Sequence, residues 1–299
     1  MKEWARVFET LAVEPGVTMM IGGPDTGKTT LTSFLANAFF EAGVTTAIVD
    51  ADVGQSDIGP PGTIGLAIVD TPLRRMGEAS LRSAYFVGAN SPEGHMHYMI
   101  AGTRKMVDRA VACAARAILV DTTGLVHGHF GLHLKQAKYD AIEPRYVVGV
   151  QRSNEIEHIL GPLERHGPAK VIRMGVSSRA RARSYEERRQ FRQAAYRRHF
   201  SPAIASRAPL DRLAFLRASR DVRLVPEKAF ANALVGLLDS RGEFLAEGTI
   251  EQVDFRDSTV TIVSRLTNEE FSRVAAVAFG SLRVTPDGNE VGRIAPGEI

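Results

Sequence analysis

Residues 22–30 read GGPDTGKTT and place Gly22, Gly27, Lys28 and Thr29 in the pattern Gly-x-x-x-x-Gly-Lys-[Ser/Thr] of a phosphate-binding P-loop. In such a loop, backbone N–H groups and a helix N-terminus face phosphate oxygens, the lysine reaches the β- and γ-phosphates, and the hydroxyl can ligate Mg²⁺. The pattern favours this chemistry over a chance glycine turn, because an apolar run precedes it and apolar residues at helical spacing follow it. The nucleotide-binding residues predicted here are Gly22, Gly23, Pro24, Asp25, Thr26, Gly27, Lys28, Thr29 and Thr30.

Acidic residues end two further predicted strands. A β-branched run ends at Asp50, and an apolar run ends at Asp121 in the form of a Walker B strand. Because the carboxyl ends of strands in an open α/β sheet form the ligand crevice, we expect Asp50, Asp52 and Asp121 to lie near the phosphates. A carboxylate there can hold Mg²⁺ or accept a proton from an attacking hydroxyl. We therefore predict a metal site of Thr29, Asp50 and Asp121 and a catalytic role for Asp52, for which a turn or helix-cap acid is the alternative.

Two other features bear on the type of reaction. Residues 145–150 predict a further strand, and Gln151 at its end is placed where a nucleotide base could be read. The stretch Asp121-Thr-Thr-Gly124 also fits the Asp-x-x-Gly switch signature of GTPases, which keeps a GTP-dependent assembly switch open. Against it, the sequence after residue 150 lacks the Asn/Thr-Lys-x-Asp pattern with which GTPases select guanine.

Three nearby histidines are spaced i, i+2 and i+6, which suits no known zinc pattern, so no dedicated metal site is predicted at His127, His129 and His133.

The positive charge of the chain is concentrated in one segment. Between Arg173 and Arg198 there are nine arginines and two glutamates, a balance of +7, whereas the whole chain carries +3 and the remainder therefore −4. A charge run is usually a solvated helix face. A run that is nearly all arginine in a P-loop protein instead suits the recognition of phosphate groups.

The overall pattern predicts an α/β protein. We expect a P-loop domain with a mostly parallel sheet at 1–200, which includes an arginine-rich lid at about 175–200. A linker with three prolines is expected at 201–230, and short β-like runs predict a small β-rich domain at 231–299. Residues 50–66 contain acids, glycines and two prolines and are expected to form a loop.

Composition restricts the class of protein further. Cys113 is the only cysteine, which excludes an internal disulfide, and its apolar neighbours predict a buried thiol. No apolar run approaches the roughly 20 residues of a membrane span, and the N-terminus lacks the apolar core of a signal peptide. A cytoplasmic protein that does not engage a membrane is therefore expected.

Six blocks of the sequence together resemble the polynucleotide 5′-hydroxyl kinases. They are GGPDTGKTT, DADVGQSDIGPPG, YFVGANSP, DTTGLVHG, RSYEERRQFRQAAYRRHF and a final β-rich segment that begins ALVGLLD, in the order of that family. The similarity covers the chain from about Val17 onward and resembles a minimal prokaryotic form, since only about 16 residues precede the first strand. It implies transfer of the ATP γ-phosphate to the 5′-hydroxyl of RNA or DNA, with Mg²⁺ and with a loose donor selectivity that includes GTP. A GTP- or ATP-dependent switch and a small-molecule kinase remain the alternatives.

The resemblance also implies roles for individual residues. Lys28 and Thr29 correspond to the family's phosphate and metal contacts and Asp52 to its candidate base, while Thr122, Thr123 and Gly124 form its "clasp" over the donor. The catalytic residues implied are Lys28, Asp52, Arg188, Arg189 and Arg192. The acceptor-binding residues implied are Gln55, Pro60, Pro61, Gly62, Ser91, Pro92 and Arg183. The clasp departs from the family pattern at Leu125, where the family has tryptophan, and at His127, where it has lysine.

Overall fold

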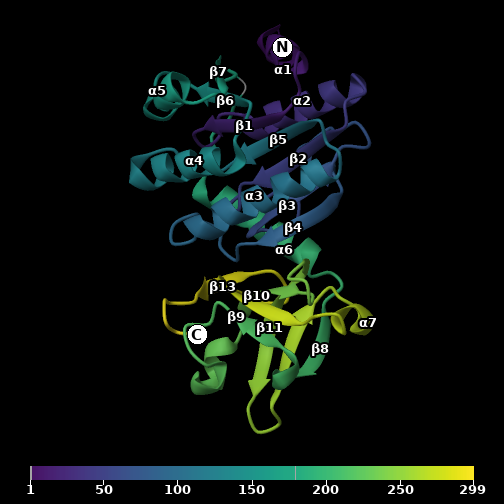
Figure 1. Ribbon diagram of the computed structural model, residues 1–299. Coiled ribbons are helices and arrows are strands. Elements are labelled where there is room, and N and C mark those ends of the chain that lie inside the picture. The colour runs from purple at the N-terminus through teal and green to yellow at the C-terminus, as the bar shows by residue number, and fades with distance from the viewer. Residues whose placement is uncertain (1, 179) are drawn as a thin grey trace. The chain divides into compact units, whose positions relative to one another are not determined.

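The computed structural model describes residues 2–178 and 180–299, and its chain packs into two compact units (Figure 1). The first unit takes the chain up to residue 59 together with Ile64–Tyr85 and Ser91–Tyr185. The second takes Pro60–Thr63, Phe86–Asn90 and Glu186–Ile299. The two units are described separately below.

A seven-stranded sheet with the order β4-β3-β2-β5-β1-β6-β7 forms the centre of the first unit. Its strands are β1 (Val17–Gly22), β2 (Thr46–Ala51), β3 (Thr63–Ile68), β4 (Leu81–Phe86), β5 (Ala117–Thr122), β6 (Tyr146–Gln151) and β7 (Lys170–Gly175). The pairings of β2 with β5, β5 with β1, β1 with β6 and β6 with β7 are all parallel. Every residue of β2, β5 and β6 is buried, as expected for parallel strands that are covered on both faces. The predicted P-loop α/β class with a mostly parallel sheet is confirmed.

Helices cover this sheet and place loops at the carboxyl ends of its strands. They are α1 (Lys2–Ala12), α2 (Lys28–Glu41), the 3₁₀ turn η1 (Met76–Glu78), α3 (Met96–Ala112), α4 (Gly128–Ile142) and α5 (Glu157–His166). Helices α1 and α2 pack together through edge-to-face ring pairs, Trp4 with Phe34 and Phe8 with Phe39. Helices α3 and α4 contact each other, α3 lies against β2, and α4 lies against β1 and α5 (Figure 1).

Strand β3 was missed by the sequence pattern, which predicted a loop throughout 50–66. The strand runs antiparallel to β2 and pairs Gly65 with Asp50. A side chain at position 65 would collide with the carbonyl of Ile58, so glycine is needed where the returning chain passes close to the 52–58 loop. The glycine that indicated a loop is therefore a requirement of close packing within a strand.

The second unit is built on an antiparallel sheet with the order β14-β13-β10-β11-β12-β8, while β9 pairs in parallel with β13. Its elements are α6 (Tyr185–His199), β8 (Ile204–Pro209), η2 (Leu210–Arg212), β9 (Ala214–Leu216), η3 (Val222–Leu224), η4 (Glu227–Phe230), β10 (Ala233–Leu238), β11 (Phe244–Asp254), β12 (Thr259–Ser264), α7 (Asn268–Phe271), β13 (Ala276–Val284) and β14 (Glu290–Arg293). Phe230, Ile262 and Phe279 belong to its hydrophobic core. This sheet confirms the predicted β-rich region at the C-terminus.

Three features differ from the sequence expectations. The predicted linker 201–230 supplies β8 and β9 to the second sheet, and helix α6 groups with that sheet from Glu186 onward. The expected burial of Cys113 is wrong, because this residue caps the C-terminus of α3 and is exposed.

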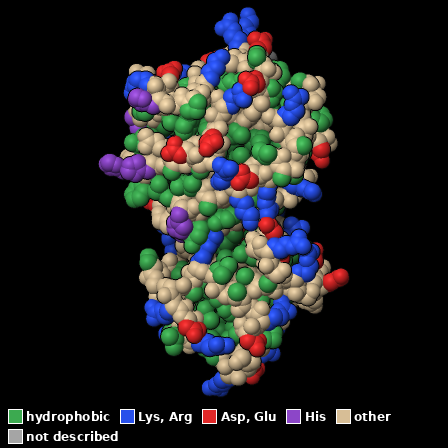
Figure 2. All heavy atoms as spheres, in the orientation of Figure 1, with side chains coloured by type: hydrophobic (Ala, Val, Ile, Leu, Met, Phe, Trp, Pro, Cys, Tyr) green, Lys and Arg blue, Asp and Glu red, His purple; other side chains and the backbone are tan. Residues whose placement is uncertain are grey.

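Among residues 2–178 and 180–299, the helices all lack the length and hydropathy that crossing a membrane requires. The face drawn in Figure 2 carries charged side chains over both units.

Candidate active site

The predicted P-loop joins β1 to α2 in the first unit. Gly27 occupies the N-cap of α2 with a φ of 90°, a left-handed conformation that side chains rarely adopt. At Gly22 a Cβ would lie 2.6 Å from the carbonyl oxygen of Val150, so the loop passes directly against β6. The two glycines of the motif are thus required by backbone conformation at one end and by close approach at the other.

The loop curls around the side chain of Lys28. The Lys28 Nζ donates to the carbonyl of Gly23 at 2.8 Å, and the Thr26 hydroxyl donates to the same carbonyl at 3.0 Å. Lys28 is 6% exposed. Its ammonium therefore lies inside the curve of the loop, where the lysine of a P-loop meets the β- and γ-phosphates.

Thr29 and Asp121 form the candidate metal site. The Thr29 hydroxyl donates to Asp121 Oδ2 at 2.6 Å. Asp121 Oδ1 is buried and has no hydrogen-bond partner in the described part of the chain. Burial raises the pKa of Asp121, while Lys28 and the Thr29 hydrogen bond oppose that shift. A hydroxyl beside a carboxylate with an unsatisfied oxygen is the donor set that P-loop proteins offer to Mg²⁺, so these residues fit the ion.

Asp50, which was predicted for the same metal site, is engaged elsewhere. Its Oδ1 accepts the backbone N–H of Asp52 at 3.1 Å, and its Oδ2 accepts those of Asp57 and Ile58 at 2.7 and 2.9 Å. Burial, followed by the nearby charge of Asp57, raises the pKa of Asp50 well above its usual range. Asp50 therefore anchors the 52–58 loop to the end of β2, and this arrangement gives no support to its predicted role as a metal ligand.

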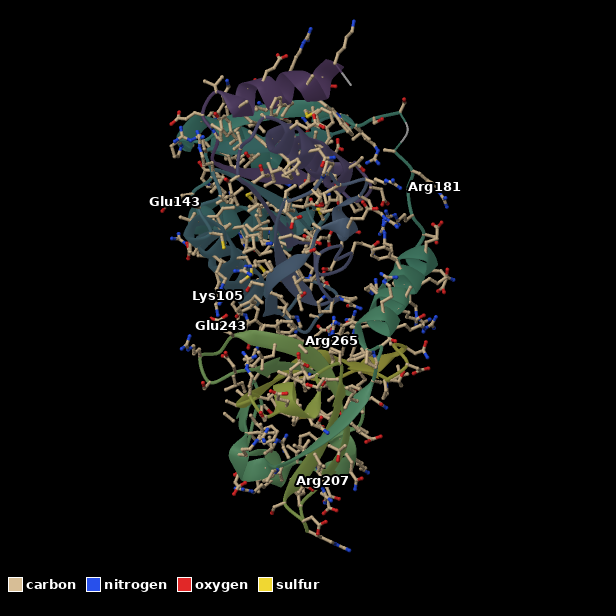
Figure 3. The ribbon with its side chains drawn as sticks, turned by 90° about the vertical axis from the view of Figure 1, so that its right-hand side faces the viewer. Lys105, Glu143, Arg181, Arg207, Glu243 and Arg265 are labelled. Carbon is tan, nitrogen blue, oxygen red and sulfur yellow. The ribbon has the colours of Figure 1, made fainter. Side chains whose placement is uncertain are left out.

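The loop that Asp50 anchors carries Asp52 and Gln55. Asp52 is half-buried, its Oδ1 accepts the N–H of Gly54 at 3.2 Å, and its charge influences the pKa of Asp121. Arg183 donates from Nη1 to Gln55 Oε1 at 3.1 Å and from its backbone N–H to Asp25 Oδ2 at 3.0 Å. Figure 3 shows the extended segment that leads to α6, with Arg181 labelled on it. Arg183 in this segment thus contacts both the P-loop and the Asp52 loop.

The clasp residues continue β5 beyond Asp121. The Thr122 hydroxyl donates to the carbonyl of Met20 on β1 at 2.6 Å. A Cβ on Gly124 would lie 2.7 Å from the nitrogen of Pro24, so the clasp rests on the P-loop at this glycine. The predicted nucleotide-binding residues of β1, β5 and the P-loop are therefore neighbours.

Two buried lysines of α4 lie beside the site and were not predicted. Lys135 Nζ donates to the Thr122 hydroxyl at 2.8 Å and to the carbonyl of Thr123 at 2.6 Å, and Lys138 Nζ lies 3.5 Å from the carbonyl of Ala51. Burial lowers the pKa of Lys135 well below its usual range and that of Lys138 to about 7, although Asp52 raises both. A sequence signal does exist: both lysines fall in register with the apolar stripe of α4, where a solvated lysine would not be expected.

Gln151 does not have the surroundings of a base-reading residue. Its amide nitrogen donates to Glu157 Oε1 at 2.6 Å, and Glu157 is paired in turn with Arg173. Arg152, the next residue, donates to the carbonyl of Asp25 at 3.2 Å and so contacts the P-loop itself. Gln151 therefore ties the end of β6 to the start of α5.

The other predicted acceptor residues form turns. Pro60, Pro61 and Gly62 are buried in the second unit, where the Gly62 carbonyl accepts the backbone N–H groups of both Val87 and Gly88 at 2.9 Å. Ser91 and Pro92 lie before α3 in the first unit. The Ser91 hydroxyl accepts the N–H of Glu93 at 3.4 Å, and the Pro92 carbonyl accepts that of His95 at 2.9 Å.

The predicted lid arginines differ in their surroundings. Arg188 and Arg189 are half-buried on α6, whereas Arg192 is buried and donates from Nε and Nη2 to the two carboxylate oxygens of Glu290 at 2.6 and 3.1 Å. A two-point ion pair of this kind holds a guanidinium in one orientation. Arg192 thus joins α6 to β14 within the second unit, which differs from the catalytic role predicted for it.

Comparison with known proteins identifies the family to which this chain is similar. Residues 22–202 match the model of the mRNA cleavage and polyadenylation factor CLP1 P-loop family. Proteins named polyribonucleotide 5′-hydroxyl-kinase from Pyrococcus furiosus and Thermococcus kodakarensis are 32% and 30% identical to this chain, over 93% and 98% of its length and 90% and 96% of theirs. A solved chain of a Clp1p–Pcf11p complex has the same fold, with a TM-score of 0.72 at 14% identity over 95% of this chain and 79% of that one. The predicted kinase resemblance is confirmed, and the chain belongs to the CLP1 P-loop family.

Proposed function

We propose that this protein is a polyribonucleotide 5′-hydroxyl kinase that transfers the γ-phosphate of ATP to the 5′-end of RNA in the presence of Mg²⁺. The observation that carries the proposal is the contact of Arg183 with both Gln55 and Asp25, since it joins the P-loop to the loop of the candidate base. The P-loop and the loop that carries Asp52 thus adjoin each other within the first unit, which supports the proposal. The names of the archaeal relatives favour RNA as the acceptor.

The reaction assigns a task to each group. The P-loop N–H groups and Lys28 hold the β- and γ-phosphates, and Thr29 with Asp121 Oδ1 would hold Mg²⁺, which neutralises charge on the phosphate oxygens. Asp52 orients the 5′-hydroxyl and accepts its proton as the oxygen bonds to the γ-phosphorus. The bond to the bridging oxygen breaks, and ADP leaves with that electron pair. Asp50 takes no direct part and keeps the 52–58 loop in place.

The arginines of the 173–198 segment divide between two tasks in this proposal. Arg183 contacts the transferred phosphoryl group or the acceptor backbone. Arg192 holds α6 through Glu290 and does not contact substrate. The donor is ATP, and GTP and other nucleoside triphosphates substitute for it because Gln151 is bound to Glu157 and does not read the base.

An acceptor screen tests the proposal. Wild type and Lys28→Ala are incubated with γ-labelled ATP, Mg²⁺ and 5′-hydroxyl or 5′-phosphate oligonucleotides of RNA and of DNA, with nucleosides as small acceptors. We expect label on 5′-hydroxyl RNA, less on DNA, none on 5′-phosphate strands, and none with Lys28→Ala although the variant folds. Labelling of nucleosides alone would point to a small-molecule kinase, and tight GDP binding without any transfer would point to a switch.

A further inference from the structure

Lys135 is a buried lysine that the mechanism above does not use. It comes from α4, is 0% exposed, and reaches the end of β5 between Asp121 and Gly124. Placing a lysine in the interior is costly unless its nitrogen is well bonded, so its partners indicate what it stabilises. Those partners are Thr122 and Thr123, two of the three residues of the clasp.

The hydrogen bonds at this point form a directed chain. The Thr122 hydroxyl gives its proton to the Met20 carbonyl, so the same oxygen can only accept from Lys135. The second donation goes to the backbone carbonyl of Thr123, and the Thr123 hydroxyl lies 3.4 Å from the same nitrogen. Two donated hydrogens suffice for the two short bonds, and both the ammonium and the neutral amine have them. The arrangement therefore holds in either protonation state.

The chain of contacts leads from α4 to the nucleotide loop. Lys135 fixes the carbonyl of Thr123, one residue before Gly124, and Gly124 packs against Pro24 with no room for a Cβ. Pro24 lies between Gly23, whose carbonyl accepts from Lys28, and Asp25, which accepts from Arg183. A shift of the Thr123 peptide would therefore move the surface on which the P-loop rests.

We propose that Lys135 is a positioning residue that sets the clasp against the P-loop and thereby gives the site its affinity for the nucleotide. The inference deepens the proposed kinase function on the donor side. It depends only on nucleotide binding, so it can be tested even if no acceptor is phosphorylated. Lys138 provides the matched control. It is equally buried one turn away on α4, but its long contact is with Ala51 on β2 and not with the clasp.

The experiment measures ADP affinity by calorimetry for wild type, Lys135→Met and Lys138→Met, with thermal melting as a check on folding. Both variants replace one buried lysine of α4 with an apolar side chain of similar length, so a general effect of removing a buried amine from this helix would weaken binding equally in both. The positioning role instead predicts a rise in Kd of about tenfold or more for Lys135→Met, as the loss of two buried hydrogen bonds gives, and a change of less than about threefold for Lys138→Met. Equal effects in the two variants, or no effect in either, would overturn the inference.

A second variant keeps the test valid if Lys135→Met fails to fold. Thr122→Val removes one of the two short acceptors and keeps the shape of the side chain. We expect Thr122→Val by itself to raise the Kd for ADP by a measurable factor below about tenfold, because it removes the bond between Lys135 and the Thr122 hydroxyl. Unchanged ADP affinity in a folded Thr122→Val variant would show that this clasp contact does not set nucleotide binding and would overturn the inference. In active preparations, KM for ATP should rise while kcat is largely retained.

Discussion

The ion pair of Arg192 and Glu290 offers a test of whether Arg192 on helix α6 has a structural or a catalytic role. Both charges are largely removed from solvent, with side chains that are 8% and 12% exposed, and the guanidinium meets the carboxylate through two bonds. Removing one partner takes away both bonds of the pair while the other charge stays buried, which costs about 3–5 kcal/mol. At about 3 kcal/mol, the melting temperature of a unit of this size falls by roughly 10 °C. We therefore expect Arg192→Gln and Glu290→Gln each to lower the melting temperature of the second unit by about that amount.

The assay combines melting curves with kinase rates at saturating substrates. Arg192→Met with Glu290→Leu should recover most of the lost stability, since no buried charge is left alone, whereas Arg189→Gln on the same helix should cost at most about 1 kcal/mol. If Arg192 only anchors α6, kcat at a temperature where each variant is folded should be similar for Arg192→Gln and Glu290→Gln. A collapse of kcat in Arg192→Gln alone, with a normal melting temperature, would refute this reasoning and restore the predicted lid role.

Two further predictions concern acids. Asp52→Asn should lower kcat by roughly 10²-fold or more with little change in ATP affinity, as the loss of a general base does. The activity of Asp121→Asn should instead be partly rescued by a raised Mg²⁺ concentration. If a Mg²⁺ titration rescued Asp52→Asn and not Asp121→Asn, the roles of the two acids would be exchanged. Glu247 has both carboxylate oxygens buried without a hydrogen-bond partner in the described residues, and burial raises its pKa well above the usual range. A carboxyl with a raised folded-state pKa stabilises the fold fully below its unfolded pKa, and that stability is lost as pH rises. Glu247→Gln should therefore gain in melting temperature relative to wild type as pH rises from about 4.5 to 8, and a pH-independent difference would contradict the assignment.

The nucleotide site could be predicted from sequence because its requirements are local. The P-loop places its glycines, lysine and threonine within nine consecutive residues. The motif spacing therefore already indicates the left-handed conformation at Gly27, the close approach of the backbone at Gly22 and the hydroxyl at the start of the helix. The placement of Asp121 beside Thr29 also followed, because parallel strands that alternate with helices bring their carboxyl ends to one edge of the sheet.

Other features depended on contacts or exposure in the folded chain that the sequence pattern does not express. Strand β3 was missed because Gly65 has a packing role that only the neighbouring Ile58 carbonyl reveals. The burial of Cys113 was wrong because apolar neighbours in sequence do not place a residue that ends a helix. These errors share one cause. A residue type predicts a local conformational preference, but it does not predict which groups will contact that residue in the folded protein.

The sequence by itself thus determined the α/β class, the phosphate-binding loop and the acids at the strand ends, since periodicity and short motifs describe groups that are close along the chain. Only the tertiary structure decided that Asp50 anchors a loop, that Lys135 bonds the clasp 12 and 13 residues before it, and that Arg192 meets a carboxylate 98 residues later. The sequence alone does not distinguish a lysine or an arginine on a solvated surface from one in the interior. Its role is set by which oppositely charged or polar groups the folded chain brings to it, because a buried charge is stable only where such partners are present.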